Sequence, residues 1–152
     1  MIPSLTFMMG EFEAEFPTDR KYASNHMWAQ PGEDGLIRFG FTAYAVRLLQ
    51  DVYFLDWTFD APKSFAKGDE MGSIESKKAE SSLYSPDSGQ LVVFNDQLMD
   101  DPSAINTDKY VGGWLFDMKS DGADLLSAEQ YVELLEDVWK KTQRTIKGQM
   151  NE

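Results

Sequence analysis

Residues 67–93 read KGDEMGSIESKKAESSLYSPDSGQLVV, and this stretch decides the fold expected for the chain. Turn-forming residues bracket it, with Gly68-Asp69 in front and SPDSG at residues 85–89 behind. Between them lie two strand-like runs, residues 71–76 and 79–84, which meet at Lys77-Lys78. The pattern predicts a β-hairpin, although a tight hairpin turn usually carries Asn, Asp or Gly at its tip.

The two lysines at this tip allow two interpretations. Exposed lysines are ordinary on protein surfaces, so the tip can be a simple solvated turn. Alternatively, one lysine is presented for covalent modification, because its flexible stem ends in an amine that can be acylated.

The motif ESKKA at residues 75–79, followed by LYSP at 83–86, resembles the lipoylation hairpin of glycine cleavage system H proteins. In that family the motif reads Glu-Ser-Val-Lys-Ala, so Lys78 matches the lysine that carries lipoate and Lys77 replaces a valine. The resemblance implies lipoate covalently attached to Lys78. It also implies that Glu75, Ser76, Lys77 and Ala79 form the surface recognised by a lipoate ligase or lipoyltransferase.

Further motifs carry the same resemblance from residue 21 to residue 135, in the family's order. They are YASNHMW at 22–28, GFTAYA at 40–45, DVYF at 51–54 and NTDKYVGGWL at 106–115. The resemblance implies a cleft for the loaded arm, built from Asn25, His26, Met27, Trp28 and Ser82. Met27 and Ser82 stand where the family usually has glutamate and aspartate, so two negative charges are missing near a bound amine. Considered alone, His26 is predicted to be a hydrogen-bonded structural residue and Trp28 a core residue.

Local patterns predict many short strands and few helices. Strands are expected at residues 11–16, 36–41, 51–59, 90–94 and 115–119. Thr42 is expected to cap a helix at 43–49 with an apolar face that includes Tyr44 and Leu48, and a capping box at 127–130 starts a helix over 127–147. The fold class is therefore mainly β. The resemblance narrows it to a lipoyl-domain barrel-sandwich hybrid with short appended helices and a C-terminal helix.

Composition limits the function. The 152 residues fit one domain, predicted here as an H-protein-like lipoyl domain over 21–147 after an N-terminal extension over 1–20. A net charge of −12 disfavours nucleic-acid binding and favours docking onto basic partner surfaces. Without cysteine and with a single histidine, no thiolate or multi-histidine metal site is expected. No apolar run approaches a membrane span and no secretion signal is present, so a cytoplasmic protein is predicted.

The predicted function is that of a carrier protein and not of an enzyme, since no catalytic constellation is recognisable. An arm on Lys78 would shuttle an aminomethyl group between partner enzymes. The resemblance implies that these are glycine decarboxylase, aminomethyltransferase and dihydrolipoamide dehydrogenase. Two alternatives remain at this stage: an H-like lipoate carrier of another pathway, such as lipoate relay or sulfur oxidation, and an unmodified interaction module.

Overall fold

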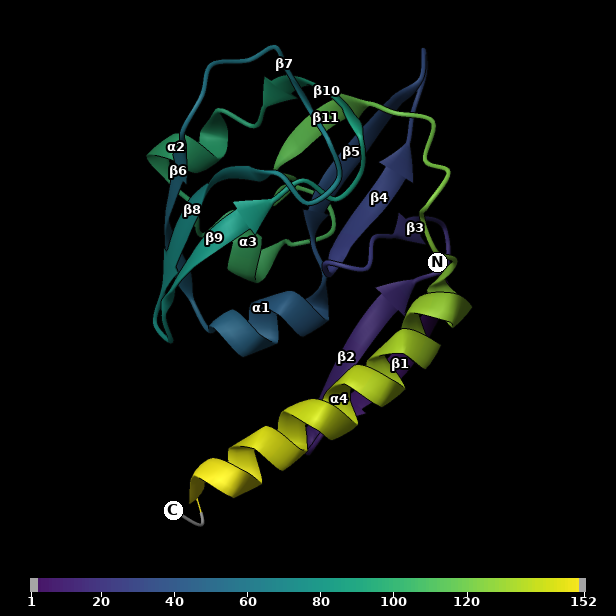
Figure 1. Ribbon diagram of the computed structural model, residues 1–152, viewed down its shortest axis with the longest axis vertical. Coiled ribbons are helices and arrows are strands. Elements are labelled where there is room, and N and C mark those ends of the chain that lie inside the picture. Colours follow the sequence, from purple (N-terminus) through teal and green to yellow (C-terminus); the bar gives the residue numbers. More distant parts are fainter. Residues whose placement is uncertain (1–2, 151–152) are drawn as a thin grey trace.

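The structure, a computed structural model, describes the backbone of residues 3–150 and the side chains up to residue 141. Its strands form three antiparallel sheets (Figure 1). The largest has the order β3 (Lys21–Tyr22), β4 (Met27–Pro31), β5 (Leu36–Phe41), β11 (Phe116–Lys119), β10 (Gly89–Phe94), β7 (Lys63–Phe65). The second has the order β6 (Val52–Trp57), β8 (Glu70–Ser76), β9 (Glu80–Tyr84), and the third is the hairpin β1 (Ser4–Met9), β2 (Phe12–Pro17).

The two larger sheets share the main hydrophobic core. In regular stretches of their strands alternate residues point into it, because side chains along a strand alternate between the two faces, and a bulge between Glu70 and Gly72 shifts this pattern in β8. Phe39, Phe116 and Met118 come from the six-stranded sheet, and Met71 and Ile74 from the three-stranded one, each at most 2% exposed. The predicted mainly β fold with appended helices and a C-terminal helix is confirmed, and its sheets do not close into a true barrel.

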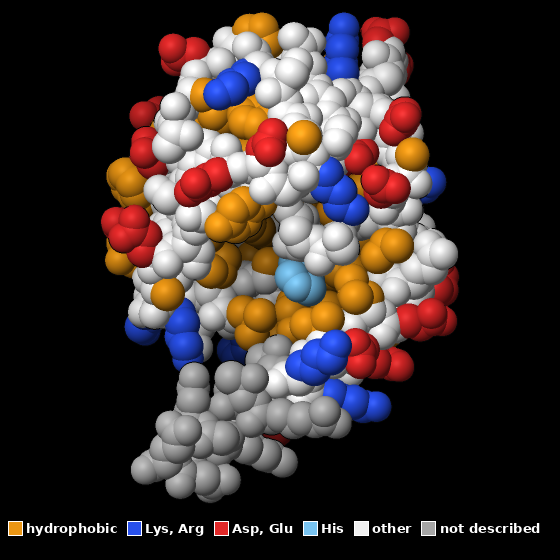
Figure 2. All heavy atoms as spheres, in the orientation of Figure 1, with side chains coloured by type: hydrophobic (Ala, Val, Ile, Leu, Met, Phe, Trp, Pro, Cys, Tyr) orange, Lys and Arg blue, Asp and Glu red, His pale blue; other side chains and the backbone are white. Residues whose placement is uncertain are grey.

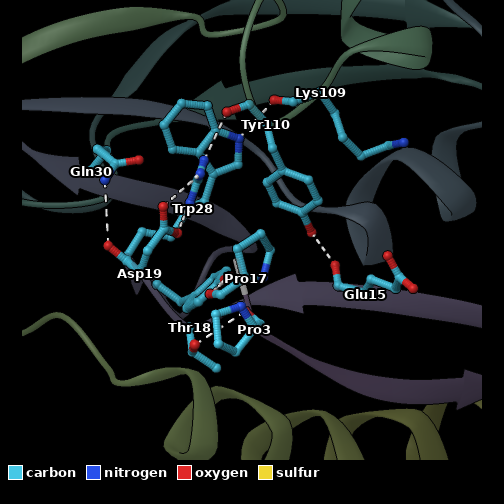
Figure 3. A network of polar contacts seen from close by, with 11 residues as sticks. Pro3, Glu15, Pro17, Thr18, Asp19, Trp28, Gln30, Lys109 and Tyr110 are labelled. Carbon is cyan, nitrogen blue, oxygen red and sulfur yellow. Dashed lines mark hydrogen bonds and ion pairs between the residues drawn. The ribbon is translucent and has the colours of Figure 1, made fainter. Parts of the chain in front are cut away.

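A second core lies where the N-terminal hairpin meets the C-terminal helix. In Figure 1, the hairpin β1–β2 lies against α4 (Ala128–Met150), below the sheets. Phe16, Tyr22 and Tyr131 are fully buried there and their rings pack together, with Tyr22 stacked on Tyr131 at 4.9 Å. Tyr110 Oη also donates to the carbonyl of Glu15 at 2.5 Å, as Figure 3 shows. The hairpin is thus packed into the body of the protein.

The helix starts agree with their sequence signals. Thr42 Oγ1 accepts a hydrogen bond from Ala45 N (3.3 Å) at the start of α1 (Ala43–Leu49). The capping box also forms, because Ser127 N donates to Gln130 Oε1 (2.9 Å) and Gln130 N donates to Ser127 Oγ (3.1 Å). Two single-turn helices, α2 (Gln97–Asp100) and α3 (Ala104–Thr107), complete the fold. No helix within residues 3–150 is long and apolar enough to cross a membrane.

One predicted helix face and one predicted strand were wrong in part. Leu48, expected on the buried face of α1, is 38% exposed, whereas Val46 is buried. The strand expected over 51–59 ends at Trp57, and a bulge between Val52 and Phe54 breaks its alternation. Tyr53 and Phe54 are therefore both exposed.

Candidate functional site

The tip of the β8–β9 hairpin is a turn shaped by one serine. Ser76 N donates to the carbonyl of Ala79 at 2.9 Å. Ser76 Oγ donates to the same carbonyl (3.0 Å) and accepts from the N–H groups of Lys78 (3.3 Å) and Ala79 (3.2 Å). Ser76 is only 4% exposed, while Lys77, Lys78 and Ala79 are exposed. The serine supplies the turn chemistry that the two lysines lack.

The end of α1 braces the same tip. Lys77 N donates to the carbonyls of Gln50 (2.9 Å) and Asp51 (3.2 Å), and Lys78 N donates to the carbonyl of Leu49 (3.3 Å). Carbonyls at a helix C-terminus have no partner inside the helix. These bonds therefore give a partner both to the carbonyls at the end of α1 and to the N–H groups of the hairpin tip. The backbone of both lysines is therefore fixed while their side chains face solvent. Figure 2 shows basic side chains at the lower left, where Figure 1 places this tip.

A groove of about 300 Å³ runs beside the hairpin, on the face shown in Figure 2. Hydrophobic side chains surround the hollow, and the pale blue histidine lies beside it (Figure 2). Its lining comes from the β3–β4 turn, β5, α1 and the hairpin: Asn25, His26, Phe41, Ala45, Leu48, Leu49, Ile74, Ser81, Ser82 and Leu83. None of these residues is acidic.

His26 connects this groove to the second core. Its Nδ1 lies 2.9 Å from Tyr131 Oη, which in turn lies 3.0 Å from Thr42 Oγ1. Burial lowers the pKa of His26 to about 4, so the imidazole is neutral at pH 7. The prediction of a hydrogen-bonded histidine is confirmed, and the ring also lines the groove. A neutral ring can accept a hydrogen bond but supplies no charge.

Asn25 joins the β3–β4 turn to the hairpin. Its Nδ2 donates to the carbonyl of Tyr84 at 3.0 Å. Its Oδ1 is buried with no hydrogen-bond partner among the described residues. The side chain of Asn25 is therefore anchored to the hairpin through its amide nitrogen.

The groove brings together only some of the residues predicted for the arm cleft. Asn25, His26 and Ser82 line it, whereas Met27 and Trp28 do not. Met27 is 2% exposed and packs in the main core. Trp28 is 1% exposed, packs in the second core and donates from Nε1 to the carbonyl of Lys109 at 2.8 Å.

The predicted recognition residues lie on one short stretch around the tip. Glu75, which is half-buried, is paired with Glu80 on β9 and with Phe54 on β6.

Sequence reasoning missed Leu48, Leu49 and Ser81 as groove residues and Tyr131 as the partner of His26. Two adjacent leucines at the end of a helix are a weak signal for an exposed apolar wall, and nothing near Tyr131 indicates its partner. Among the described residues, no group of three or more His, Cys, Asp or Glu side chains could hold a metal ion.

Comparisons with known proteins identify the family of the chain. The sequence model of the family "Glycine cleavage H-protein" matches residues 20–138. The chain is 40% identical over 119 residues to the glycine cleavage system H protein of Psychrobacter sp. (76% of this chain, 94% of that protein). It is 41% identical over 125 residues to that of Citrobacter koseri (80% and 96%). The crystal structure of the H protein from Mycobacterium marinum matches with a TM-score of 0.68 and 36% identity, over 78% of this chain and 97% of that chain.

The fold and the exposed-lysine hairpin are those of a lipoyl-type carrier domain. The chain belongs to the glycine cleavage H-protein family. Members of this family are carrier proteins that bear lipoate on a lysine, and membership supports a lipoyl-carrier role in the glycine cleavage system.

Proposed function

We propose that this chain carries lipoate on Lys78 and shuttles an aminomethyl group between the enzymes of glycine cleavage. The observation that carries the proposal is the hairpin tip: Lys78 is exposed, while its backbone N–H contacts both Ser76 and the end of α1. A fixed root with a free side chain suits an acceptor that a modifying enzyme must recognise by shape. Glu75, Ser76, Lys77 and Ala79 are the proposed recognition residues.

The groove is the proposed resting place of the loaded arm. It begins beside the tip, because Leu49 both lines it and accepts the hydrogen bond from Lys78 N. Leu48 and Leu49 offer an apolar wall, and Asn25, His26 and Ser82 offer polar atoms. A tethered arm also reaches a docked partner at a high effective concentration.

The proposed partners follow from the family. They are a lipoate ligase or lipoyltransferase, glycine decarboxylase, aminomethyltransferase and dihydrolipoamide dehydrogenase, in the cytoplasm. We also propose that residues 1–20 are an addition to a lipoyl domain over 21–147. The family match begins at residue 20, and the relatives are matched over nearly their whole length, which supports this division.

Mass spectrometry tests the attachment site. The full chain is incubated with a lipoate ligase, ATP and lipoate, and its intact mass and proteolytic peptides are measured. One lipoyl group on Lys78 is expected, with none on Lys78→Arg. Lys77→Arg keeps the positive charge of this proposed recognition residue and should still be modified on Lys78. Modification of Lys77, or of the Lys78→Arg variant, overturns the assignment. A chain that stays unmodified supports the interaction-module alternative.

One observation favours a second candidate, an H-like lipoate carrier of another pathway. The groove lining contains no carboxylate to neutralise the ammonium of an aminomethyl adduct. Two assays of the lipoylated chain separate the candidates. Glycine-dependent loading by glycine decarboxylase supports the glycine cleavage role. Failure to load, with transfer of the lipoyl group to an unmodified lipoyl domain by a lipoyltransferase, supports the relay role.

A further inference from the structure

A second hollow lies on the opposite side of α1 from the groove. It has a volume of about 360 Å³ and is lined by Phe12, Ala43, Val46, Arg47, Gln50, Asp51, Lys77, Asn106 and Lys109. At 3.6 residues per turn, Val46, Arg47 and Gln50 lie on the helix face opposite Ala45, Leu48 and Leu49, which line the groove. Lys77 and Lys78 thus stand at the end of the helix that separates the two hollows.

The charge of this pocket is opposite to that of the protein. Arg47, Lys77 and Lys109 come from three separate segments, and Asp51 is the one acidic residue that lines the pocket with them. Within residues 3–141, none of these three cations forms an ion pair. The sequence contains 26 acidic residues that could have neutralised them. Gathering like charges costs free energy by Coulomb repulsion, which a bound anion would offset.

The structure fixes the guanidinium of Arg47 and the backbone of the two lysines. The guanidinium of Arg47 lies 4.5 Å from the ring centre of Phe12, a cation–π contact made by the N-terminal hairpin. The backbone of Lys77 is fixed by α1, and the carbonyl of Lys109 accepts from Trp28 Nε1. Figure 3 shows the side chain of Lys109 extending away from Trp28. The pocket lining thus offers one planar guanidinium and two lysine side chains, which are groups that suit phosphate and carboxylate oxygens.

We infer that this pocket binds a small multivalent anion of the phosphate or carboxylate class, one residue from the lipoyl attachment site. With its net charge of −12, the protein would repel a large acidic partner surface more strongly than a small anion. The apolar floor of Phe12, Ala43 and Val46 leaves room for an organic part of the ligand. Anion binding does not depend on lipoylation. A protein that does not bind the anion can therefore be told apart from one that does not accept lipoate.

A nuclear magnetic resonance titration of the unmodified, ¹⁵N-labelled full chain tests this inference. Pyrophosphate and citrate are added in separate experiments at constant ionic strength. We expect saturable shifts of the amide signals of Arg47, Gln50, Lys77 and Lys109. Tighter binding of pyrophosphate assigns the site to phosphates, and tighter binding of citrate assigns it to carboxylates.

Matched variants separate this pocket from general attraction to lysines. Lys77→Met combined with Lys109→Met is expected to weaken binding at least about tenfold, because two charge-assisted contacts are lost. Lys67→Met combined with Lys119→Met removes the same charge from exposed positions that do not line the pocket. This control pair should bind normally. Shifts that do not saturate, or equal weakening in both pairs, overturn the inference.

Discussion

Ser76 has a structural role at the hairpin tip that can be measured by itself. Its buried hydroxyl bonds to the backbone of both Lys78 and Ala79. Ser76→Ala leaves these groups with fewer partners and is expected to destabilise the protein by about 1–3 kcal/mol. Urea unfolding gives the free energy. Ser73→Ala, on the same strand and without a side-chain hydrogen bond in the described part, should stay within about 0.5 kcal/mol of the parent. Equal effects of the two variants would show that the hydroxyl does not shape the turn.

His26 should make stability depend on pH. Its pKa is about 4 in the folded protein, against an ordinary value of 6.5, because burial disfavours the charged form. Between these values the unfolded chain binds more protons, so the free energy of unfolding falls as the pH is lowered from about 6.5 to about 4. The loss is at most roughly 3 kcal/mol.

Two measurements check the histidine. The imidazole protons should titrate well below pH 6 in nuclear magnetic resonance spectra. In His26→Asn the titrating group is gone, so the free energy of unfolding should change less between pH 7 and pH 4.5. Asn is chosen because it tolerates the positive φ of 74° at this position. An imidazole that titrates at 6.5 contradicts the prediction.

The uncharged groove has a consequence for the cargo. With Ser82 where the family usually has aspartate, the loaded arm should lose its aminomethyl group to water rapidly. Ser82→Asp is expected to slow that loss by up to about tenfold, through one charge-assisted hydrogen bond. Met27→Glu is not a useful companion because the side chain of Met27 is buried in the apolar core. The adduct is followed by mass spectrometry on the isolated loaded protein.

Ser64→Asp is the control for this charge change, since Ser64 is exposed on β7 and does not line the groove. A stable adduct in the parent, with no gain in Ser82→Asp, would show that the groove protects the ammonium without a carboxylate.

Sequence reasoning worked at residues whose neighbours in the chain define their role. Thr42 and the capping box of Ser127 and Gln130 cap their helices as expected, because a cap depends only on the order of nearby residues. The contact of His26 with Tyr131 and the approach of Phe12 to Arg47 join segments far apart in the sequence. No local periodicity encodes such approaches, so the groove residues and the basic pocket could not be derived from spacing.

Among the secondary-structure elements, the N-terminal hairpin carries a clear energetic prediction. Phe16 on β2 is fully buried against Tyr22 and Tyr131. Phe16→Ala should cost about 3–5 kcal/mol, because it removes a large apolar side chain and leaves a cavity. Met8→Ala on the other face of the same hairpin is the control, since Met8 is 52% exposed. Thermal or urea unfolding gives both values. A hairpin that can lose Phe16 without loss of stability would not be part of the folded core.

The same hairpin shows where strand patterns succeed and fail. Residues 11–16 alternate cleanly, and the expected strand forms as β2, which buries Ala14 and Phe16. Its partner β1 was not predicted because the exposed Met8 between Phe7 and Met9 makes an apolar run that hides the alternation. In β6 a bulge inserts one residue, and a rule of period two cannot foresee it.

The fold of the protein brings a strongly acidic surface together with a basic tip. Figure 2 shows acidic side chains spread over much of this face of the protein, with basic ones near the tip and at a few other places. The sequence gives the net charge but not this distribution, which depends on how the sheets and helices pack. A negative body should be drawn to a basic partner surface over roughly one Debye length, about 10 Å at 0.1 M salt.

Docking of the lipoylated protein should therefore depend on salt. The apparent KM for this carrier in the glycine decarboxylase reaction is expected to rise several-fold between about 20 mM and about 300 mM salt, because screening weakens electrostatic attraction. Free lipoamide, which is uncharged, is the control acceptor and corrects for direct effects of salt on the enzyme. A KM that does not change with salt would mean that apolar contacts carry docking. Tyr53 and Phe54, exposed by 59% and 48% on β6 next to the β8–β9 hairpin, would then be the first side chains to replace.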